Sequence, residues 1–293
     1  MTSSEADLGL DSRAIAAEEG DIGVTRRRKR GKRSTFWRVR ADIPRGLELS
    51  LIAVSLALPL LIWSAVYLSG QVNSIVLPNP IDTAETGYRL LTNGPLLDDV
   101  RISTQRVAIG FGISLLIAVP LGLAMGTFAS IRALFEPAIG FIRYAPATAF
   151  TMLFIIWLGL GEDPKIALVA FGTVFFNTLM IANVVWSVPM ELIKVAQTLG
   201  ASGFTVFRKV IFPHAIPGII DAARVNLAAA WNLIIVAELI AAEAGVGRRI
   251  VNAQKFLRTE EIFVVIVAIG VIGVTTDIGL RLLRDRLSPW SQE

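Results

Sequence analysis

The amino-acid sequence predicts an all-α membrane protein, an integral bundle of six transmembrane helices. Hydrophobic residues make up 54% of its 293 residues, whereas soluble domains are usually about 45–50% apolar. Six runs of about 20 residues are long and apolar enough to cross a hydrocarbon core of about 30 Å as helices. A polar segment between the fourth and fifth runs has its own helical periodicity, which predicts an ordered loop outside the bilayer.

The placement of the basic residues predicts the orientation of the bundle. A basic cluster at 26–33 lies in a polar tail, which we expect to be disordered and cytoplasmic. Such a cluster also suits nucleic acid, but directly before a hydrophobic span it marks the cytoplasmic side and contacts anionic lipid headgroups. Arg281, Arg284 and Arg286 follow the last span. We therefore expect a multi-pass protein of the cell (inner) membrane, in contact with lipid and not with nucleic acid, with both termini cytoplasmic.

The order of the hydrophobic runs predicts the domain organisation. The expected parts are a basic tail, a first transmembrane helix with an external loop, a core membrane domain and a C-terminal tail, at residues 1–45, 46–104, 105–287 and 288–293. The spans are expected at 47–68, 107–128, 135–160, 165–186, 216–240 and 261–283. Gly122 and Gly126 in the second span form a G-x-x-x-G pattern, which permits close packing of helices in lipid.

The polar segment at about 190–213 is predicted to fold as two short helices. Apolar residues recur at helical spacing at Leu192, Val195 and Leu199, and Gly200 then interrupts the pattern. A second amphipathic run at 204–212 precedes Pro213, and prolines are expected to end it. A loop with one apolar face must bury that face, either against a partner protein or on the lipid surface.

This segment resembles the E-A-A, G, I-x-L-P signature of bacterial ATP-binding-cassette (ABC) importer permeases. The residues that carry the resemblance are Lys194, Val195, Ala196, Gly200, Val210 and Pro213. Lys194 and Val195 replace the acidic residue and the first alanine, and Phe212 replaces the leucine. In that family the segment is a cytoplasmic coupling helix that docks into a groove of an ATPase subunit. The resemblance assigns this role to Lys194, Val195, Ala196, Leu199, Gly200, Phe204, Arg208 and Pro213.

Two further stretches resemble the nitrate, sulfonate, taurine and bicarbonate subfamily of these permeases. Residues 231–250 resemble its pattern of a tryptophan, a glutamate and G-x-G, and residues 141–161 resemble its proline-containing third helix. The resemblance implies the type I ABC importer permease fold and an ATP-driven import of a small solute, here an anion. It implies as partners a second permease copy in a homodimer, an extracytoplasmic substrate-binding protein and two ABC ATPase subunits, which would bind ATP and Mg.

Polar residues inside the spans are candidates for a translocation path or an outer gate, because such residues usually face a bundle interior or water. The candidates are Glu238, Asn232, Trp231 and Arg143. Glu238 is expected to meet a basic residue of the outer segment or of a partner, and Asn232 to add a buried amide. Arg143 is expected about two turns from the inner end of its span, within reach of the headgroups. Structural ion pairs and hydrogen bonds remain open as the alternative.

Four basic residues on the predicted outer side, Arg248, Arg249, Lys255 and Arg258, violate the positive-inside rule. Three explanations remain open. They attract an anionic substrate, they dock acidic lobes of a binding protein, or they pair with nearby glutamates such as Glu238 and Glu261 and serve no transport role.

Several classes of function are disfavoured. The sequence has no G-x-x-x-x-G-K-[ST] loop, so the chain is not expected to bind ATP, and no nucleophile–base arrangement points to a catalytic site. It has no cysteine and a single histidine, His214, so no metal or cofactor site is expected. The chain is thus predicted to be non-catalytic. A secondary, ion-coupled transporter is the alternative, although no inverted repeat supports it.

Overall fold

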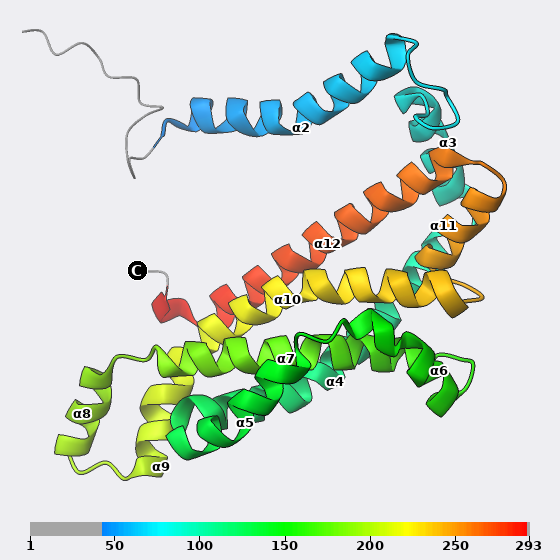
Figure 1. Ribbon diagram of the computed structural model, residues 1–293. Coiled ribbons are helices and arrows are strands. Elements are labelled where there is room, and N and C mark those ends of the chain that lie inside the picture. Colours follow the sequence, from blue (N-terminus) through cyan, green and yellow to red (C-terminus); the bar gives the residue numbers. More distant parts are fainter. Residues whose placement is uncertain (1–42, 292–293) are drawn as a thin grey trace, which may run out of the picture. The chain divides into compact units, whose positions relative to one another are not determined.

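The computed structural model describes residues 43–291, and every regular element in that range is a helix. The chain divides into two units, residues 1–59 and 60–293. Helix α2 (Arg45–Leu68) crosses this boundary (Figure 1). The predicted basic tail falls almost entirely outside the described residues. The architecture below is that of the second unit.

Five helical stretches of the described chain are long and apolar enough to span a membrane. They are α2, α4 (Leu96–Thr127), α7 (Asp163–Trp186), the continuous stretch Gly203–Ala241 and α12 (Thr259–Leu287). A sixth span forms if α5 (Ala129–Ile142) and the stretch Ala147–Leu158, which are bent by 77° at a short break, are taken as one. The predicted six-span helical bundle is therefore confirmed.

The third span is not the continuous helix that its hydropathy predicts. Helix α5 ends at Ile142, the 3₁₀ turn η2 (Ala147–Phe150) follows, and α6 (Thr151–Leu158) completes the span. Pro146 explains the break, because proline disfavours the helical conformation of the residue before it and cannot donate a backbone hydrogen bond. The break leaves irregular backbone inside a membrane span, which membrane proteins tolerate where protein or a water-filled cavity surrounds it.

Helices α4 and α7 form the most closely packed pair because glycines on α4 let the backbones meet. A Cβ atom at Gly126 would lie 2.4 Å from Cβ of Val185, and one at Gly122 would lie 2.8 Å from Cβ of Ile181. Both distances are far shorter than real carbon–carbon contacts. The close packing predicted from the G-x-x-x-G pattern is thus confirmed, and α7 is its partner.

A chain of buried polar groups crosses the same helices. The side-chain amide of Asn177 donates to Oγ of Ser114 at 2.9 Å, and that of Asn226 donates to Oδ1 of Asn177 at 2.8 Å. These three residues come from α4, α7 and α10 (Phe212–Ala241). Buried amides must find partners in a medium without water, so the chain links the three helices through bonds that lipid cannot replace.

An ionic cluster ties the first half of α10 to the second half of α12. Arg224 donates to both oxygens of Asp277, at 2.9 and 2.8 Å, and to Asp221 at 2.9 Å, which also accepts from Arg284. Arg224 and Asp221 pair within α10, three residues apart. Asp277 pairs across helices with Arg224, whose guanidinium meets it in a bidentate geometry.

The loop after α2 folds back on the bundle through the short helix α3 (Pro80–Thr92). Oδ1 of Asn79 accepts from the backbone N–H of Ile81 and caps the helix. The indole of Trp63 stacks on Phe263 at 5.0 Å between ring centroids and donates to the carbonyl of Pro78 at 3.0 Å. These contacts hold the outer end of α2 and the loop against α12.

Candidate functional site

The segment between the fourth and fifth spans folds as α8 (Met190–Thr198), α9 (Gly203–Val206), the π-helical turn η3 (Phe207–Ile211) and then α10. Figure 1 shows α8 and α9 together at one end of α7 and α10, opposite α6 and α11 (Val246–Lys255). The expectation that Pro213 and Pro217 end the second short helix is wrong. Both lie within α10: Pro213 is in its first turn, where a proline is tolerated, and Pro217 is inside the helix.

Gly200 makes the turn between α8 and α9. It has φ +81°, and the backbone N–H of Ala201 reaches back to the carbonyl of Ala196 at 3.0 Å, a helix-ending arrangement that favours glycine. A Cβ atom there would meet nothing within 4 Å. The glycine is therefore required for the backbone conformation, and not for close approach to a neighbouring helix.

The two faces of α8 differ in their contacts. Ile193 and Ala196 pack onto a core cluster of the chain itself, which includes Val206 and Ile211. Ala196, assigned to coupling by the resemblance, thus contacts its own chain. The opposite face exposes Leu192, Val195, Leu199 and, from α9, Phe204, with Leu199 82% exposed. Lys194 and Arg208 are exposed, and Pro213 is partly buried. An ordered apolar surface of this kind requires a partner or a lipid surface.

Glu238 is the centre of a buried polar network near the C-terminal end of α10. Its carboxylate is fully buried and accepts hydrogen bonds from Oγ of Ser103 and from Nη1 of Arg106, each at 2.7 Å. The backbone N–H of Gly247 donates to its other oxygen at 2.8 Å. Glu238 was expected to meet a base of the outer segment or of a partner protein. That expectation is wrong, because Arg106 of α4 neutralises it within the same chain.

Arg106 joins this network to the turn before α7. Its guanidinium binds both carboxylate oxygens of Glu162 and donates to the carbonyl of Ala244 at 2.8 Å. Nζ of Lys165 also donates to Glu162, at 3.1 Å. The hydrogen bond from Arg106, and then that from Lys165, lower the pKa of the Glu162 carboxyl from 4.5 to about 2. The cations Arg106 and Lys165 thus balance two carboxylates, Glu238 and Glu162. Buried charges require such compensation.

The loop that leads into α11 is shaped to lie on this network. Gly245 has φ +115°, and a Cβ atom there would lie 2.6 Å from Oε1 of Glu238 and 2.7 Å from Nη1 of Arg106. A Cβ atom at Gly247 would lie 2.6 Å from Cβ of Glu238. The G-x-G pattern is therefore a steric requirement of the Glu238–Arg106 pair.

Asp99 holds the same loop from α4. Its carboxylate accepts from the backbone N–H of Gly245 at 2.9 Å and pairs with Arg249 at 2.6 Å. Arg258 pairs with Glu261 at 3.2 Å. Local pairing thus accounts for Arg249 and Arg258, two of the four basic residues that violate the charge rule, although the main partner of Arg249 is Asp99 and not one of the expected glutamates. No ion pair accounts for Arg248 or Lys255 within the described residues.

The other candidate path residues lie apart from this network. Trp231 is buried in the core, and its Nε1 has no hydrogen-bond partner within the described chain. Asn232, expected to be buried, is exposed, because it occupies the face of α10 opposite the core. The buried amides are instead those of Asn177 and Asn226.

Arg143 caps the end of α5 at the break in the third span and is exposed. Helix α5 begins at Ala129, so Arg143 follows 14 helical residues, a rise of about 21 Å. It therefore lies between the two helices of the bent pair, and its reach to the headgroups stays a prediction. Its guanidinium carbon lies 5.0 Å from the ring centroid of Tyr144. Both residues line a pocket of about 180 Å³, together with Ala147, Gly172 and Phe176.

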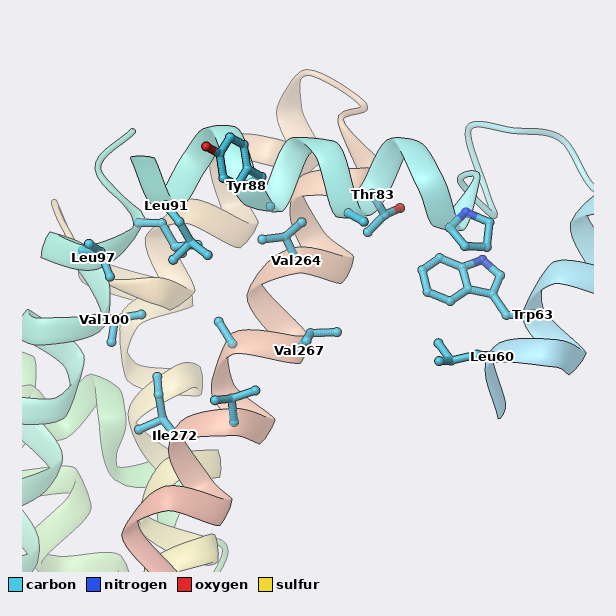
Figure 2. Close-up of a pocket in the computed structure, with 16 residues that line it drawn as sticks. Leu60, Trp63, Thr83, Tyr88, Leu91, Leu97, Val100, Val264, Val267 and Ile272 are labelled. Carbon is cyan, nitrogen blue, oxygen red and sulfur yellow. The ribbon is translucent and has the colours of Figure 1, made fainter. Parts of the chain in front are cut away.

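A second pocket differs from this one in chemistry. It has a volume of about 650 Å³ and lies among α3, α4 and α12 near Leu60 and Trp63 (Figure 2). Aliphatic residues such as Leu97, Val264 and Val267 dominate its wall, and the wall contains no charged residue of the described chain. An anion would find no compensating charge there, so of these two pockets only the one at Arg143 suits a charged solute.

Residues 118–290 match the family described as the inner membrane component of binding-protein-dependent transport systems. A probable ABC transporter permease of Brucella abortus (strain 2308) is 36% identical over 247 residues, which cover 84% of this chain and 97% of that protein. The taurine transport system permease protein TauC of Escherichia coli (strain K12) is 32% identical over 256 residues, which cover 85% and 93%. The inward-facing MetNI methionine ABC transporter has a similar fold, with a TM-score of 0.56 and 18% identity over 68% of this chain and 96% of that chain.

Proposed function

Because this chain belongs to the family of inner membrane components of binding-protein-dependent transport systems, and is a permease subunit of an ABC importer, we propose that it imports a small oxyanion, such as a sulfonate, taurine, nitrate or bicarbonate. The taurine permease supports this class, since taurine carries a sulfonate group. The exposed cation at Arg143 supports it independently. The comparisons give no support to a secondary transporter.

The family implies an ATPase and a substrate-binding protein as partners. We propose the finer assembly of two copies of this chain, two ATPase subunits that bind ATP and Mg, and one extracytoplasmic binding protein. Neither catalysis nor a bound cofactor is assigned to this chain. The basic residues Arg281, Arg284 and Arg286 at the end of the last span support a cytoplasmic C-terminus, with α8 and α9 on the same side.

The exposed apolar surface formed by Leu192, Val195, Leu199 and Phe204 is the observation that carries the coupling role. Its opposite face is packed on the chain's own core, so the surface is held in place and would move with α7 and α10 as one body. Docked on an ATPase, it would transmit closure of the ATPase dimer to the bundle. The permease would then switch between inward-open and outward-open states, biased by nucleotide at one end and by the binding protein at the other.

Leu199→Glu tests this docking surface. We expect it to weaken co-purification of the ATPase and to abolish ATP-dependent uptake, because a charge would be placed in an apolar contact. Gln197→Glu is the matched control, since it adds the same charge at an exposed polar position of the same helix. The measurements are ATPase recovery with the tagged permease and uptake of labelled taurine, methanesulfonate or nitrate in proteoliposomes that hold the whole complex and its binding protein.

Two results would count against the proposal. Normal ATPase recovery and uptake in Leu199→Glu would mean that this surface lies on lipid or elsewhere. A wild-type complex that imports a cationic or neutral solute, and none of the oxyanions, would reject the substrate class while leaving the permease role intact.

A further inference from the structure

The break in the third span places a guanidinium in the membrane part of the chain without a carboxylate beside it. Within the described residues, the contacts of Arg143 are with Tyr144, whose hydroxyl lies 3.3 Å from Nη2 and whose ring lies against the guanidinium. Three other arginines of the described chain each bind at least one carboxylate. Arg106 binds Glu238 and Glu162, Arg132 binds Glu136, and Arg224 binds Asp277.

An arginine without a counter-charge is expensive in hydrocarbon, and Arg143 lies between the two halves of the bent third span. Such residues usually face a bundle interior or a water-filled cavity. The guanidinium must therefore be neutralised by a group outside the described residues, and the surroundings of the break indicate which kind of group fits.

The pocket beside Arg143 is small and mixed in character. Its volume of about 180 Å³ is below the roughly 300–1,000 Å³ of sites for drug-sized ligands, so it has room only for a small solute. Aromatic side chains such as Phe171 and Phe176 form one wall, and Arg143 and Tyr144 supply polar groups.

Helix α10 also packs beside the break in the third span. A Cβ atom at Gly172 would touch both Leu233 and Ala147, which brings the break and α10 together at this glycine. Gly172 also lines the pocket beside Arg143, so α10 lies close to that pocket.

We propose that Arg143, with the hydroxyl of Tyr144, is the contact that the transported oxyanion makes inside the membrane. A planar guanidinium can donate two parallel hydrogen bonds to an oxyanion, and the phenol supplies a further donor. The aromatic wall would accept the small organic part of an alkyl sulfonate. This inference rests on the proposed oxyanion substrate and deepens it by naming the residues that hold it.

Thiol labelling tests the site without relying on transport. The chain has no cysteine, so Phe176→Cys introduces a single thiol into the wall of the pocket. We expect an anionic methanethiosulfonate to react faster than a cationic one by about tenfold, the effect of one positive charge a few ångströms away in a partly aqueous site. The ratio is normalised to that at Gln71→Cys, an exposed position of the outer loop.

Adding Arg143→Gln should remove this preference, whereas Arg143→Lys should keep most of it. Methanesulfonate or nitrate in excess should slow the labelling in the Arg143 protein and not in the Arg143→Gln protein. The proposal is overturned if neither reagent reacts, which would mean that lipid or another chain covers the break. It is also overturned if the ratio or the protection is the same in all three proteins.

Uptake separates this inference from the proposed function. Arg143→Gln should raise the KM for oxyanion uptake roughly tenfold, since it loses a charged hydrogen-bond donor. Arg286→Gln makes the same change at an exposed position on the inner end of α12 and should not alter KM. If the wild-type complex imports an oxyanion and Arg143→Gln does so with the same KM, only this inference fails. If the wild type imports no oxyanion, the proposed substrate fails, and the labelling still decides whether Arg143 binds one.

Discussion

Arg106 and Arg143 lie in two membrane helices of the same chain and have opposite surroundings. The side chain of Arg106 is 5% exposed and is bound by two carboxylates, a carbonyl and a loop whose glycines leave room for it. Arg143 is exposed, has an aromatic neighbour and lies at a break made by a proline. Arg106 holds the helices and the loop together, whereas the guanidinium of Arg143 has N–H donors that no carboxylate of the described chain accepts.

These two arginines show how structural charges can be told apart from functional ones in a membrane protein. Both arginines are costly in hydrocarbon by the same reasoning, so position in a span does not distinguish them. What distinguishes them is the number of carboxylates that bind each arginine within the described residues. Glu238 looks like a gate residue in the sequence, but its complete set of partners assigns it to the structural group.

Breaking the network at Glu238 should have the largest effect. Glu238→Leu leaves a buried guanidinium with one carboxylate fewer, and it leaves Ser103 and the N–H of Gly247 without an acceptor. Loss of one partner of a buried ion pair typically costs about 3–5 kcal/mol. We expect the apparent melting temperature of the detergent-purified permease to fall by on the order of 10 °C.

Arg143→Leu sharpens this test, because it also deletes a charge from a membrane helix. Its guanidinium is exposed on the chain, so the melting temperature should change by only about 1–3 °C. Equal losses of stability in the two variants would contradict the distinction between the two arginines. So would a Glu238→Leu protein that is as stable as the wild type.

The glycines over the network should give the next largest effect. Gly245→Ala combines a positive φ with a Cβ atom 2.6 Å from the Glu238 carboxylate. The conformational part costs roughly 1–2 kcal/mol, and the steric part requires the ion pair to move. We expect a loss of stability clearly greater than 2 kcal/mol, seen as a lower melting temperature and poorer recovery of the monodisperse protein.

Gly159→Ala separates the two parts of that cost. Gly159 ends α6 with φ +81°, and a Cβ atom there would meet nothing within 4 Å. This control should show the conformational cost alone. If Gly245→Ala is no worse than Gly159→Ala, the loop does not depend on room above Glu238 and Arg106, and the explanation of the G-x-G pattern is wrong.

Hydropathy predicted the fold because a membrane span appears in the sequence as one continuous run of apolar residues. The spans at 47–68 and 165–186 differ from the structure by at most two residues. The start of α4 at Leu96 was missed, because its first turns carry Asp98, Asp99 and Arg101 and extend beyond the apolar run. Helical structure outside the bilayer leaves no hydropathy signal, so the boundary could not be read from composition.

The site was harder to predict because its partners are far apart in sequence. Arg106 lies 132 residues before Glu238, and no local spacing connects them. The signal that existed was the G-x-G pattern, since paired glycines after a helix suggest a close contact. Asn232 and Asn226 are both polar residues of α10, and only packing against α4 and α7 decides that Asn226 is the buried one.

Protonation of Glu162 should give the smallest effect, and it tests the outer edge of the network. Hydrogen bonds from Arg106 and Lys165 lower the pKa of this carboxyl from 4.5 to about 2. A carboxyl with a lowered pKa contributes stability that is fully present above the unfolded value and is lost as the pH falls towards the folded value. The contribution should therefore be constant above about pH 5 and disappear between pH 4.5 and 2.

The measurement is the difference in melting temperature between the wild type and Glu162→Gln across this range, which cancels the titration of the carboxylates that both proteins share. The Glu162 side chain is 54% exposed, so solvent and salt screen the pair, and its contribution should be no more than about 1 kcal/mol. Raising the salt concentration at pH 7 should shrink the difference, whereas the effect of Glu238→Leu, in which both charges are buried, should persist. A difference that stays constant down to pH 2 would mean that Arg106 does not depend on Glu162 and that Glu238 alone neutralises it.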